Sequence, residues 1–263
     1  MGNPVISVVT VSFNAASCIE KTIRSVLSQT CTGFEYIIID GGSTDGTQDI
    51  VRKYSDRIAY FVSEPDGGIY DGMNKGMRAA SGLYVIYMNA DDVFADESVL
   101  SDVVSFALSH PEAEVIYGDS VQVREYGSYL SVPREAAIGH KMAISHQASF
   151  VSRELMLTHP FDLRYRYAAD FEQLSYFHGQ GRTFVHMDRV IAVVEMRSGT
   201  TFRHELESAQ EMYSIISSRG IDISKERDRI LRHKRMVRCF KRWTPGFVSR
   251  PLLRMVAKFY KPL

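Results

Sequence analysis

The sequence predicts an α/β protein with a mostly parallel sheet and helices on its faces. Short β-branched segments alternate with segments of helical periodicity over the first hundred residues. Two of the β segments, Tyr36–Asp40 and Leu83–Met88, run directly into acidic turns. Because ligands of open α/β sheets bind beyond the carboxyl ends of the strands, we expect both turns to face one site.

The first elements follow from residue type and spacing. Val5–Val11 is rich in β-branched residues and predicts a buried strand. The segment 17–20 has the form of a capping box, Ser-Cys-Ile-Glu, and predicts a helix that begins near Ser17. A second helix is expected from about Thr47, followed by a short strand over Ile58–Ser63.

Later elements continue the alternation. Apolar residues at helical spacing over 69–82 predict a third helix. Val115–Asp119 predicts another strand that ends in an acid, and Ala148–Val151 predicts an apolar strand. An amphipathic helix is predicted near the end of the chain's second third, because Phe171, Leu174 and Phe177 would lie on one of its faces.

Composition sets broad limits. At 263 residues, 45% hydrophobic and 24% charged, the chain suits one large domain or a domain with an appendage. Cys18, Cys31 and Cys239 lack metal-ligand spacing, which predicts free thiols, no zinc site and a reducing compartment. No secretion signal or membrane span is apparent, so we expect a cytoplasmic protein whose membrane contact, if any, is peripheral.

The acidic turns suggest a nucleotide ligand. Asp91 and Asp92 follow an apolar strand, and such carboxylates suit Mg²⁺ or Mn²⁺ that bridges to a diphosphate. A solvated loop or helix cap is the alternative for these two residues. Asp40 suits hydrogen bonds from a base or ribose, and its alternative is a turn residue that bonds only nearby backbone.

Four segments carry a resemblance to a known family: Val8–Asn14, Asp40–Thr47, Ser63–Gly76 and Met88–Asp92. Over about residues 5–95 the chain resembles family 2 glycosyltransferases of the GT-A fold, whose sheet is Rossmann-like. Gly68–Gly76 and Ser145–Gln147 look most like the bacterial branch that includes colanic-acid-type polysaccharide transferases. The resemblance implies a sugar transfer in surface polysaccharide assembly.

On the donor side, the resemblance implies that Val11 and Asp40 hold the nucleotide base, with Asp66 near the same pocket. UDP is expected more than GDP. Much of the family carries an Arg in the helix that is predicted here over 69–82, and this chain lacks that Arg. Lys75 or Arg78 could supply that charge to the diphosphate, and solvated helix charges are the alternative.

Asn89, Ala90 and Asp91 occupy the family's Asp-x-Asp motif. Asn89 stands where the family usually has the first Asp of this motif. The contact made by that Asp therefore becomes a hydrogen bond with a neutral side chain. Asp91 remains as the direct ligand of Mg²⁺ or Mn²⁺, with Asp92 beside it. The ion would offset charge on the departing diphosphate.

On the acceptor side, Asp119 is expected to line the cleft. His146 stands at the mouth of a strand, either as a hydrogen-bonded core group or as a substrate contact. The family's catalytic base matches Asp170, with Glu172 as the nearby alternative. A single displacement on the sugar then inverts its configuration, with no covalent intermediate.

The domain organisation follows from charge. Residues 1–224 form the predicted GT-A domain, with a nucleotide-sugar half over about 1–95 and an acceptor half over about 96–224. The segment 225–263 carries thirteen Lys or Arg and two acids, a net of +11. It predicts basic amphipathic helices on an anionic membrane, next to a glycan or lipid-linked acceptor. A solvated helical pair or a nucleic-acid-binding stretch is the alternative, and no nucleic-acid partner is predicted.

Other classes fit less well. A dehydrogenase would need Gly-x-Gly-x-x-Gly after the first strand, and a P-loop enzyme would need Gly-Lys-Ser/Thr; both motifs are missing. A nucleotidyltransferase would carry a glycine-rich loop where Val8–Ser17 has no glycine. The alternative that remains is a sugar-nucleotide-binding or nucleotidyltransferase-like protein without glycosyl transfer.

Overall fold

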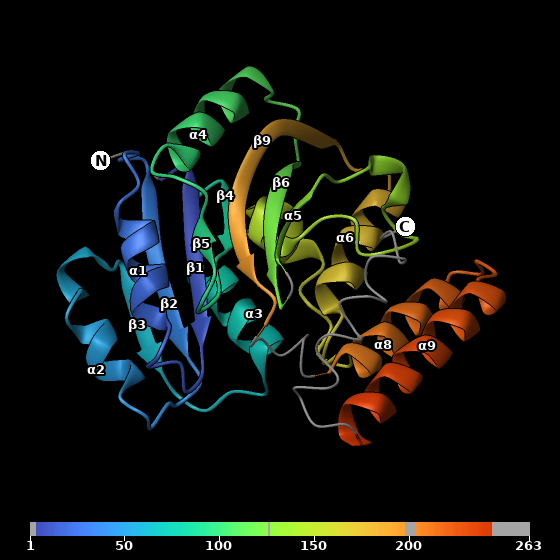
Figure 1. The fold of residues 1–263 in the computed structure, drawn as a ribbon. Coiled ribbons are helices and arrows are strands. Elements are labelled where there is room, and N and C mark those ends of the chain that lie inside the picture. The colour runs from blue at the N-terminus through green and yellow to red at the C-terminus, as the bar shows by residue number, and fades with distance from the viewer. Residues whose placement is uncertain (1–3, 126, 198–203, 244–263) are drawn as a thin grey trace.

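Nine strands form one sheet in the computed structural model, which describes residues 4–125, 127–197 and 204–243. The sheet curves through the molecule with helices on both sides (Figure 1). Its strand order is β3 (Tyr60–Ser63), β2 (Phe34–Asp40), β1 (Ile6–Ser12), β4 (Tyr84–Tyr87), β8 (Ser149–Ser152), β6 (Val115–Arg124), β9 (Phe184–Glu195) and β5 (Val93–Phe94), with β7 (Gly127–Ser131) paired to β6.

The sheet is mostly parallel, as predicted. β3, β2, β1 and β4 pair in parallel. β8 is antiparallel to both β4 and β6, so β6 runs in the same direction as β1, and β9 is parallel to β6. The carboxyl ends of β1, β2 and β4 therefore lie at one edge, as expected for the two acidic turns.

Alternating side chains of β1 divide the core into two layers. Val8 belongs to the layer that packs α1 (Ile19–Leu27), α2 (Thr47–Arg52) and α4 (Val99–Ser109) on the sheet. Val9 faces the opposite layer, with α3 (Ile69–Ala79), α5 (Arg153–Thr158) and α6 (Ala169–Gly179). This second layer packs α3 together with α5 and α6.

The predicted capping box at 17–20 is wrong. Helix α1 begins at Ile19 after Cys18, and no side chain caps it. The backbone N–H groups of Cys18 and Ile19 donate instead to the carbonyl of Ala15. The Glu20 carboxylate points away from the helix start, because it accepts hydrogen bonds from Arg24 and Tyr54.

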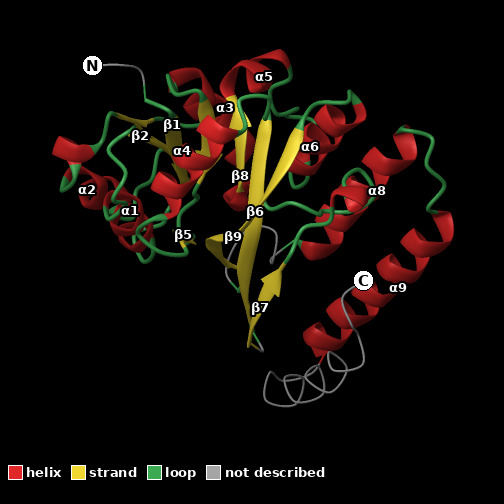
Figure 2. Cartoon of the chain, turned by 90° about the horizontal axis from the view of Figure 1, so that it is seen from above, coloured by secondary structure: helices red, strands yellow, loops and turns green. Residues whose placement is uncertain are grey.

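Two helices follow the sheet. α8 (Glu205–Ser218) lies next to α6, and α9 (Ser224–Trp243) lies beside α8 (Figures 1 and 2). Ile230 and Leu231 of α9 pack against a cluster that contains Phe171 and Ile216. The predicted helix in the basic segment is confirmed over Ser224–Trp243, and residues 244–263 lie outside the described part of the chain. In that described part, no helix combines the length and apolar character that a membrane span needs.

Candidate functional site

Asp40 organises the turn after β2. It is fully buried, and its carboxylate accepts hydrogen bonds from the hydroxyls of Ser12, Ser43 and Ser63 and from the Ser43 N–H. Burial opposes its charged form, but these hydrogen bonds outweigh burial and lower the pKa of Asp40. Both carboxylate oxygens therefore already have protein donors, while the turn itself stands at the predicted edge.

Val11 and Asp66 meet beside this turn because two glycines leave room for them. A Cβ on Gly41 would lie 2.9 Å from Asp66 Oδ2, and one on Gly72 would lie 2.7 Å from Val11 Cγ1. The Ala90 N–H donates to the carbonyl of Val11 at 3.4 Å, which joins the turn after β4 to the same group. The structure thus brings together the residues predicted to surround the base.

The acidic turn after β4 is held by Thr22 of α1. The Thr22 hydroxyl donates to the carbonyl of Asp92 at 2.8 Å and accepts from the Asp91 N–H at 2.9 Å. Asp92 is buried, and its carboxylate accepts from Gln147 at 2.8 Å and from the Glu195 N–H at 2.9 Å. Burial raises the pKa of Asp92 to about 6. The two neighbouring acids therefore differ in environment.

Asp91 turns toward solvent. Its φ of 85° lies in the left-handed region, which is uncommon for a residue other than glycine. Its Oδ1 lies 3.1 Å from Lys21 Nζ, which also donates to the Asp91 carbonyl at 2.9 Å. The side chain is 25% exposed, whereas the Asp92 residue is 5% exposed.

The carboxylates of this turn suit one kind of metal site. Among the described residues, no group of three or more His, Cys, Asp or Glu side chains could enclose a metal ion. One accessible carboxylate nevertheless fits Mg²⁺ or Mn²⁺, since such ions often bind through one or two carboxylates plus substrate phosphates and water. Asp91 meets that requirement. Asp92 has both oxygens engaged by protein donors.

Lys75 is paired within its own neighbourhood. Its Nζ lies 2.8 Å from Glu64 Oε1 and 3.9 Å from Asp71 Oδ2, and it donates to the Pro65 carbonyl. The hydrogen bond to Glu64 is the main reason why the pKa of Lys75 is raised. Arg78 is exposed on the same helix. A contact of either residue with a diphosphate stays a prediction.

Asp170 lies buried at the start of α6. Its Oδ1 accepts from the Tyr70 hydroxyl at 2.9 Å and from the Phe171 N–H at 2.8 Å, and its Oδ2 lies 2.7 Å from His146 Nδ1. Burial favours the protonated form, but the contacts with His146 and the other hydrogen bonds outweigh it and lower the pKa of Asp170. Asp170 is therefore ionised and surrounded by donors.

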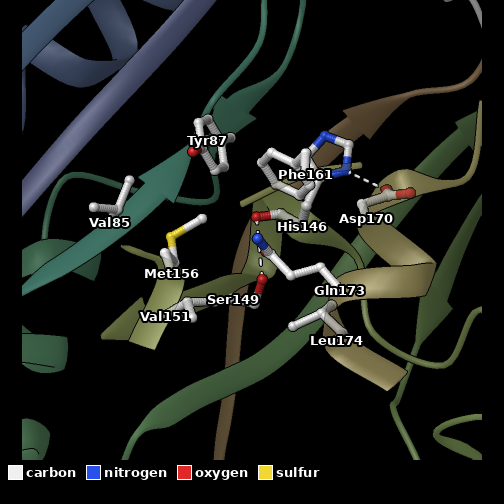
Figure 3. A pocket seen from close by; sticks show the side chains of 10 residues that line it. All are labelled: Val85, Tyr87, His146, Ser149, Val151, Met156, Phe161, Asp170, Gln173 and Leu174. Carbon is white, nitrogen blue, oxygen red and sulfur yellow. Dashed lines mark hydrogen bonds and ion pairs between the residues drawn. The ribbon is translucent and has the colours of Figure 1, made fainter. Parts of the chain in front are cut away.

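His146 links Asp170 to Asn89 in the turn after β4. Its Nε2 lies 3.0 Å from Asn89 Nδ2, so a continuous chain of contacts runs through Asn89, His146, Asp170 and Tyr70. Figure 3 shows the imidazole of His146 directed at Asp170. Asn89 is 9% exposed, and its Oδ1 has no hydrogen-bond partner. A buried polar atom without a partner often marks a place for a ligand or water.

The cavity beside this chain is too small for a sugar. It has about 10 Å³, which holds about one water molecule, and it is lined mainly by apolar side chains from β4, β8, α5 and α6 (Figure 3).

Asp119 and Glu172 have partners of their own. Asp119 Oδ1 lies 3.0 Å from His186 Nε2, which joins β6 to β9. Glu172 lies 2.9 Å from His159 and 3.5 Å from Arg219, which joins α6 to the end of α5 and to α8. Their printed contacts are thus separate from the chain between Asn89 and Asp170, and their predicted acceptor roles stay predictions.

Two side-chain contacts that hold this site in place were not predicted from the sequence. The Glu211 carboxylate of α8 accepts the backbone N–H groups of Arg166, Tyr167 and Ala168, just before α6. Tyr70 reaches Asp170 from α3 across 100 residues of sequence. The only available signal for Tyr70 was its place in the Gly68–Gly76 segment of the family resemblance.

Comparison with known proteins identifies the family. The sequence pattern of Glycosyl transferase family 2 matches residues 7–160, more than half of the 263-residue chain. The chain belongs to glycosyltransferase family 2. A PGL/p-HBAD biosynthesis glycosyltransferase of Mycobacterium bovis is 32% identical over 179 residues, which cover 65% of this chain and 69% of that protein. The putative teichuronic acid biosynthesis glycosyltransferase TuaG of Bacillus subtilis is 41% identical over 34% of this chain and 36% of its own length.

Solved structures support the GT-A fold of this family 2 chain. S. aureus TarS 1–349 in complex with UDP has a TM-score of 0.64 and 20% identity, over 86% of this chain and 69% of that one. A mannosyltransferase from Pyrobaculum calidifontis in complex with GDP-Man and Mn²⁺ has a TM-score of 0.67 and 17% identity, over 99% and 82% of the two chains. At these identities the likeness establishes the fold.

Proposed function

We propose that this family 2 glycosyltransferase moves a sugar, with inversion, from a nucleotide-diphosphate sugar to a hydroxyl of a glycan or lipid-linked acceptor. The observation that carries the proposal is the 3.0 Å contact between Asn89 and His146. It joins the turn that carries Asp91 to the buried Asp170–His146 pair, so the groups that we propose for the departing diphosphate and for the base lie next to each other. A single displacement in such a site inverts the anomeric carbon.

A role in bacterial surface polysaccharide or glycolipid assembly is supported by the relatives. The Mycobacterium bovis protein is named for PGL/p-HBAD biosynthesis and the Bacillus subtilis protein for teichuronic acid biosynthesis. The similarity to colanic-acid-type transferases stays a prediction. For the donor we keep UDP ahead of GDP; the solved neighbours include complexes with UDP, UDP-GlcNAc and GDP-Man.

Asp91 is the residue that would hold Mg²⁺ or Mn²⁺ in this site. When bound, the ion would supply positive charge to the departing diphosphate. The chain's own residues prepare this arrangement: Thr22 fixes the backbone on both sides of Asp91, and Lys21 balances its charge. Asp92 and Gln147 connect the same turn to the segment that carries His146.

The base belongs to the acceptor side. Tyr70 and the Phe171 N–H hold one oxygen of Asp170 and His146 holds the other, so the pair is fixed before substrate arrives. General-base catalysis of this kind contributes about 10²–10⁴-fold to a rate. Buried surroundings also keep water from competing with the acceptor hydroxyl.

One experiment separates transfer from mere binding. The melting temperature of the full chain is measured with UDP or GDP, with and without Mn²⁺. Separate, unheated protein is incubated with a panel of radiolabelled sugar nucleotides and lipid or glycan acceptors. We expect one nucleotide to raise the melting temperature and its sugar to be transferred, because a ligand of the native state stabilises it. Nucleotide protection without transfer from any donor would instead support the sugar-nucleotide-binding alternative.

Membrane attachment through the basic segment is part of the proposal. Arg229, Arg232 and Arg235 are exposed on α9, whereas Ile230 and Leu231 pack toward α8. Each cation near an anionic surface contributes about 1 kcal/mol. We expect the full chain to sediment with anionic liposomes in low salt, and a triple change of these arginines to Glu to sediment less. Equal sedimentation of both proteins would contradict a role for this face.

A further inference from the structure

We propose that Glu211 of α8 is a positioning residue for Asp170, the proposed base. The inference rests on the proposed glycosyl transfer, in which Asp170 takes the proton from the acceptor hydroxyl. Both residues lie beyond the stretch that matches the family pattern, residues 7–160. In this assignment Glu211 acts on Asp170 through the backbone that leads into α6, so that α8 is a working part of the acceptor side.

The backbone of residues 166–168 is held by a single carboxylate. Oε1 of Glu211 accepts the Arg166 N–H at 3.0 Å, and Oε2 accepts the N–H groups of Tyr167 at 2.7 Å and Ala168 at 3.1 Å. Asp170 follows two residues after Ala168, at the second position of α6. Three hydrogen bonds to one side chain therefore fix the approach to the base relative to α8.

Helix α6 takes its cap from α8. Its N-cap residue is Ala168, which offers no side-chain acceptor, whereas Ser, Thr, Asp or Asn usually stabilises a helix at this position. In a capping box, a Glu of the first turn binds the backbone N–H of the N-cap residue. Glu211 makes that contact with Ala168 from 43 residues away. A negative charge is favourable there, because the N-terminus of a helix carries partial positive charge.

This contact lies at a packed junction of the two helices, which are neighbours in Figure 2. Ala168 and Phe171 share one buried cluster with Tyr213 and Ile216 of α8. Hydrogen bonds to a charged group are strong, and they gain further where water competes less. The start of α6 therefore depends on α8 both through apolar packing and through Glu211.

The charge of Glu211 also reaches the surroundings of the base. Burial, the contacts with Asp170 and, to a smaller extent, the charge of Glu211 raise the pKa of the Tyr70 hydroxyl. Tyr70 thus stays protonated and donates to Asp170 Oδ1 at 2.9 Å. Removal of the Glu211 carboxylate would alter the backbone before Asp170 and the electrostatic environment of Tyr70 together.

A base tolerates little displacement. It must lie within about 2.6–3.2 Å of the atom whose proton it takes. A misplacement of about 1 Å can cost about 10²-fold in rate. Because Asp170 stands in the first turn of α6, a shift of the backbone at 166–168 moves its carboxylate directly.

The test is Glu211→Gln in the full chain. The amide oxygen can still accept hydrogen bonds, but the amide NH₂ would face a backbone N–H, donor against donor. We expect kcat to fall by about 10–100-fold, with the donor KM and nucleotide protection against heat unchanged. Glu205→Gln is the matched control, because Glu205 lies on the same helix and pairs with Lys234 at 3.4 Å. It should keep kcat within about threefold of the wild-type value.

A double-mutant cycle separates positioning from general damage to the fold. In the Asp170→Asn background the base is already lost, so Glu211→Gln should lower the remaining rate by less than about threefold. A fall by the same factor in both backgrounds would overturn the inference, as would nearly full kcat in Glu211→Gln alone. Glu211→Asp keeps the carboxylate on a shorter side chain and supplies the same cycle if the Gln variant does not fold.

Ile215→Val controls for packing. It removes one buried methylene group from the α8 cluster and no hydrogen bond. We expect it to keep kcat within about threefold, and a loss equal to that of Glu211→Gln would contradict a specific role for the carboxylate. A wild-type protein that transfers no sugar from any donor would instead refute the proposed function, so the two failures are distinguishable.

Discussion

The two sides of the site, which we propose for the donor and the acceptor, hold their carboxylates in different ways. On the donor side, Asp40 binds mainly hydroxyls and backbone from its own and adjacent strand ends. On the acceptor side, Asp170 is held by His146 from 24 residues away and by Tyr70 from 100 residues away. The contacts of Asp40 therefore join the ends of neighbouring parallel strands, since Ser12 and Ser63 lie 28 and 23 residues from it, whereas the contacts of Asp170 form only when α3, α6 and the 146–148 turn have packed together.

The largest expected effect tests the acceptor side. Asp170→Asn keeps the shape of the side chain but loses the negative charge with which the predicted base would accept a proton. Transfer should fall by about two to four orders of magnitude, while nucleotide affinity is retained. Steady-state kinetics together with a calorimetric nucleotide titration would measure both. If Glu172→Gln abolished transfer and Asp170→Asn did not, the predicted base would have to be reassigned to Glu172.

The second prediction concerns stability on the donor side. Asp40→Ala removes an acceptor from three buried or half-buried hydroxyls and one N–H, and unsatisfied buried donors are costly. We expect the free energy of unfolding in urea to fall by about 4 kcal/mol. Asp49→Ala, in an exposed pair with Arg52, is the control and should change it by less than about 1 kcal/mol. Equal effects would show that the Asp40 network contributes little to stability.

The third prediction uses pH to separate Asp92 from Asp91. Burial raises the pKa of Asp92 to about 6, above the usual value of about 4 in an unfolded chain. Between these values the folded state binds more protons than the unfolded state, so stability decreases as pH rises from about 4 to about 6. The loss is on the order of 3 kcal/mol.

Asp92→Asn should remove this pH dependence when unfolding is followed in EDTA. The same unfolding measurements are repeated with Mn²⁺ and nucleotide for comparison. If Asp92 serves only to bind Gln147 and the Glu195 N–H, the ion should leave its contribution to the pH profile unchanged. If the ion abolishes the contribution, Asp92 is a metal ligand as well.

The sequence predicted the strand ends in this comparison well. The strands that end in Asp40 and before Asn89 follow from β-branched runs and acidic turns, and the structure has them as β2 and β4. The antiparallel pairings of β8 are different, since they depend on partners far along the chain. The pairing of His146 with Asp170 also could not be predicted, because neither residue carries a local signal of the other. Side-chain pairs made by tertiary packing are not encoded in periodicity.

The smallest expected effect belongs to Lys21. Its ion pair with Asp91 is exposed, with 51% of the Lys21 side chain accessible, and such pairs are worth about 0–1 kcal/mol. A divalent ion that bound Asp91 through Oδ1 would displace Lys21 Nζ from that atom. Lys21→Met should therefore strengthen Mn²⁺ binding in the presence of nucleotide by at most about fivefold.

Electron paramagnetic resonance of free Mn²⁺ would measure this change without any need for turnover. Arg24→Met is the matched control, because Arg24 forms an exposed pair with Glu20 on the same helix. It should leave Mn²⁺ affinity unchanged. Weaker Mn²⁺–nucleotide binding in Lys21→Met would assign Lys21 to the diphosphate instead, and the donor side would then contain a cation that contacts the leaving group directly.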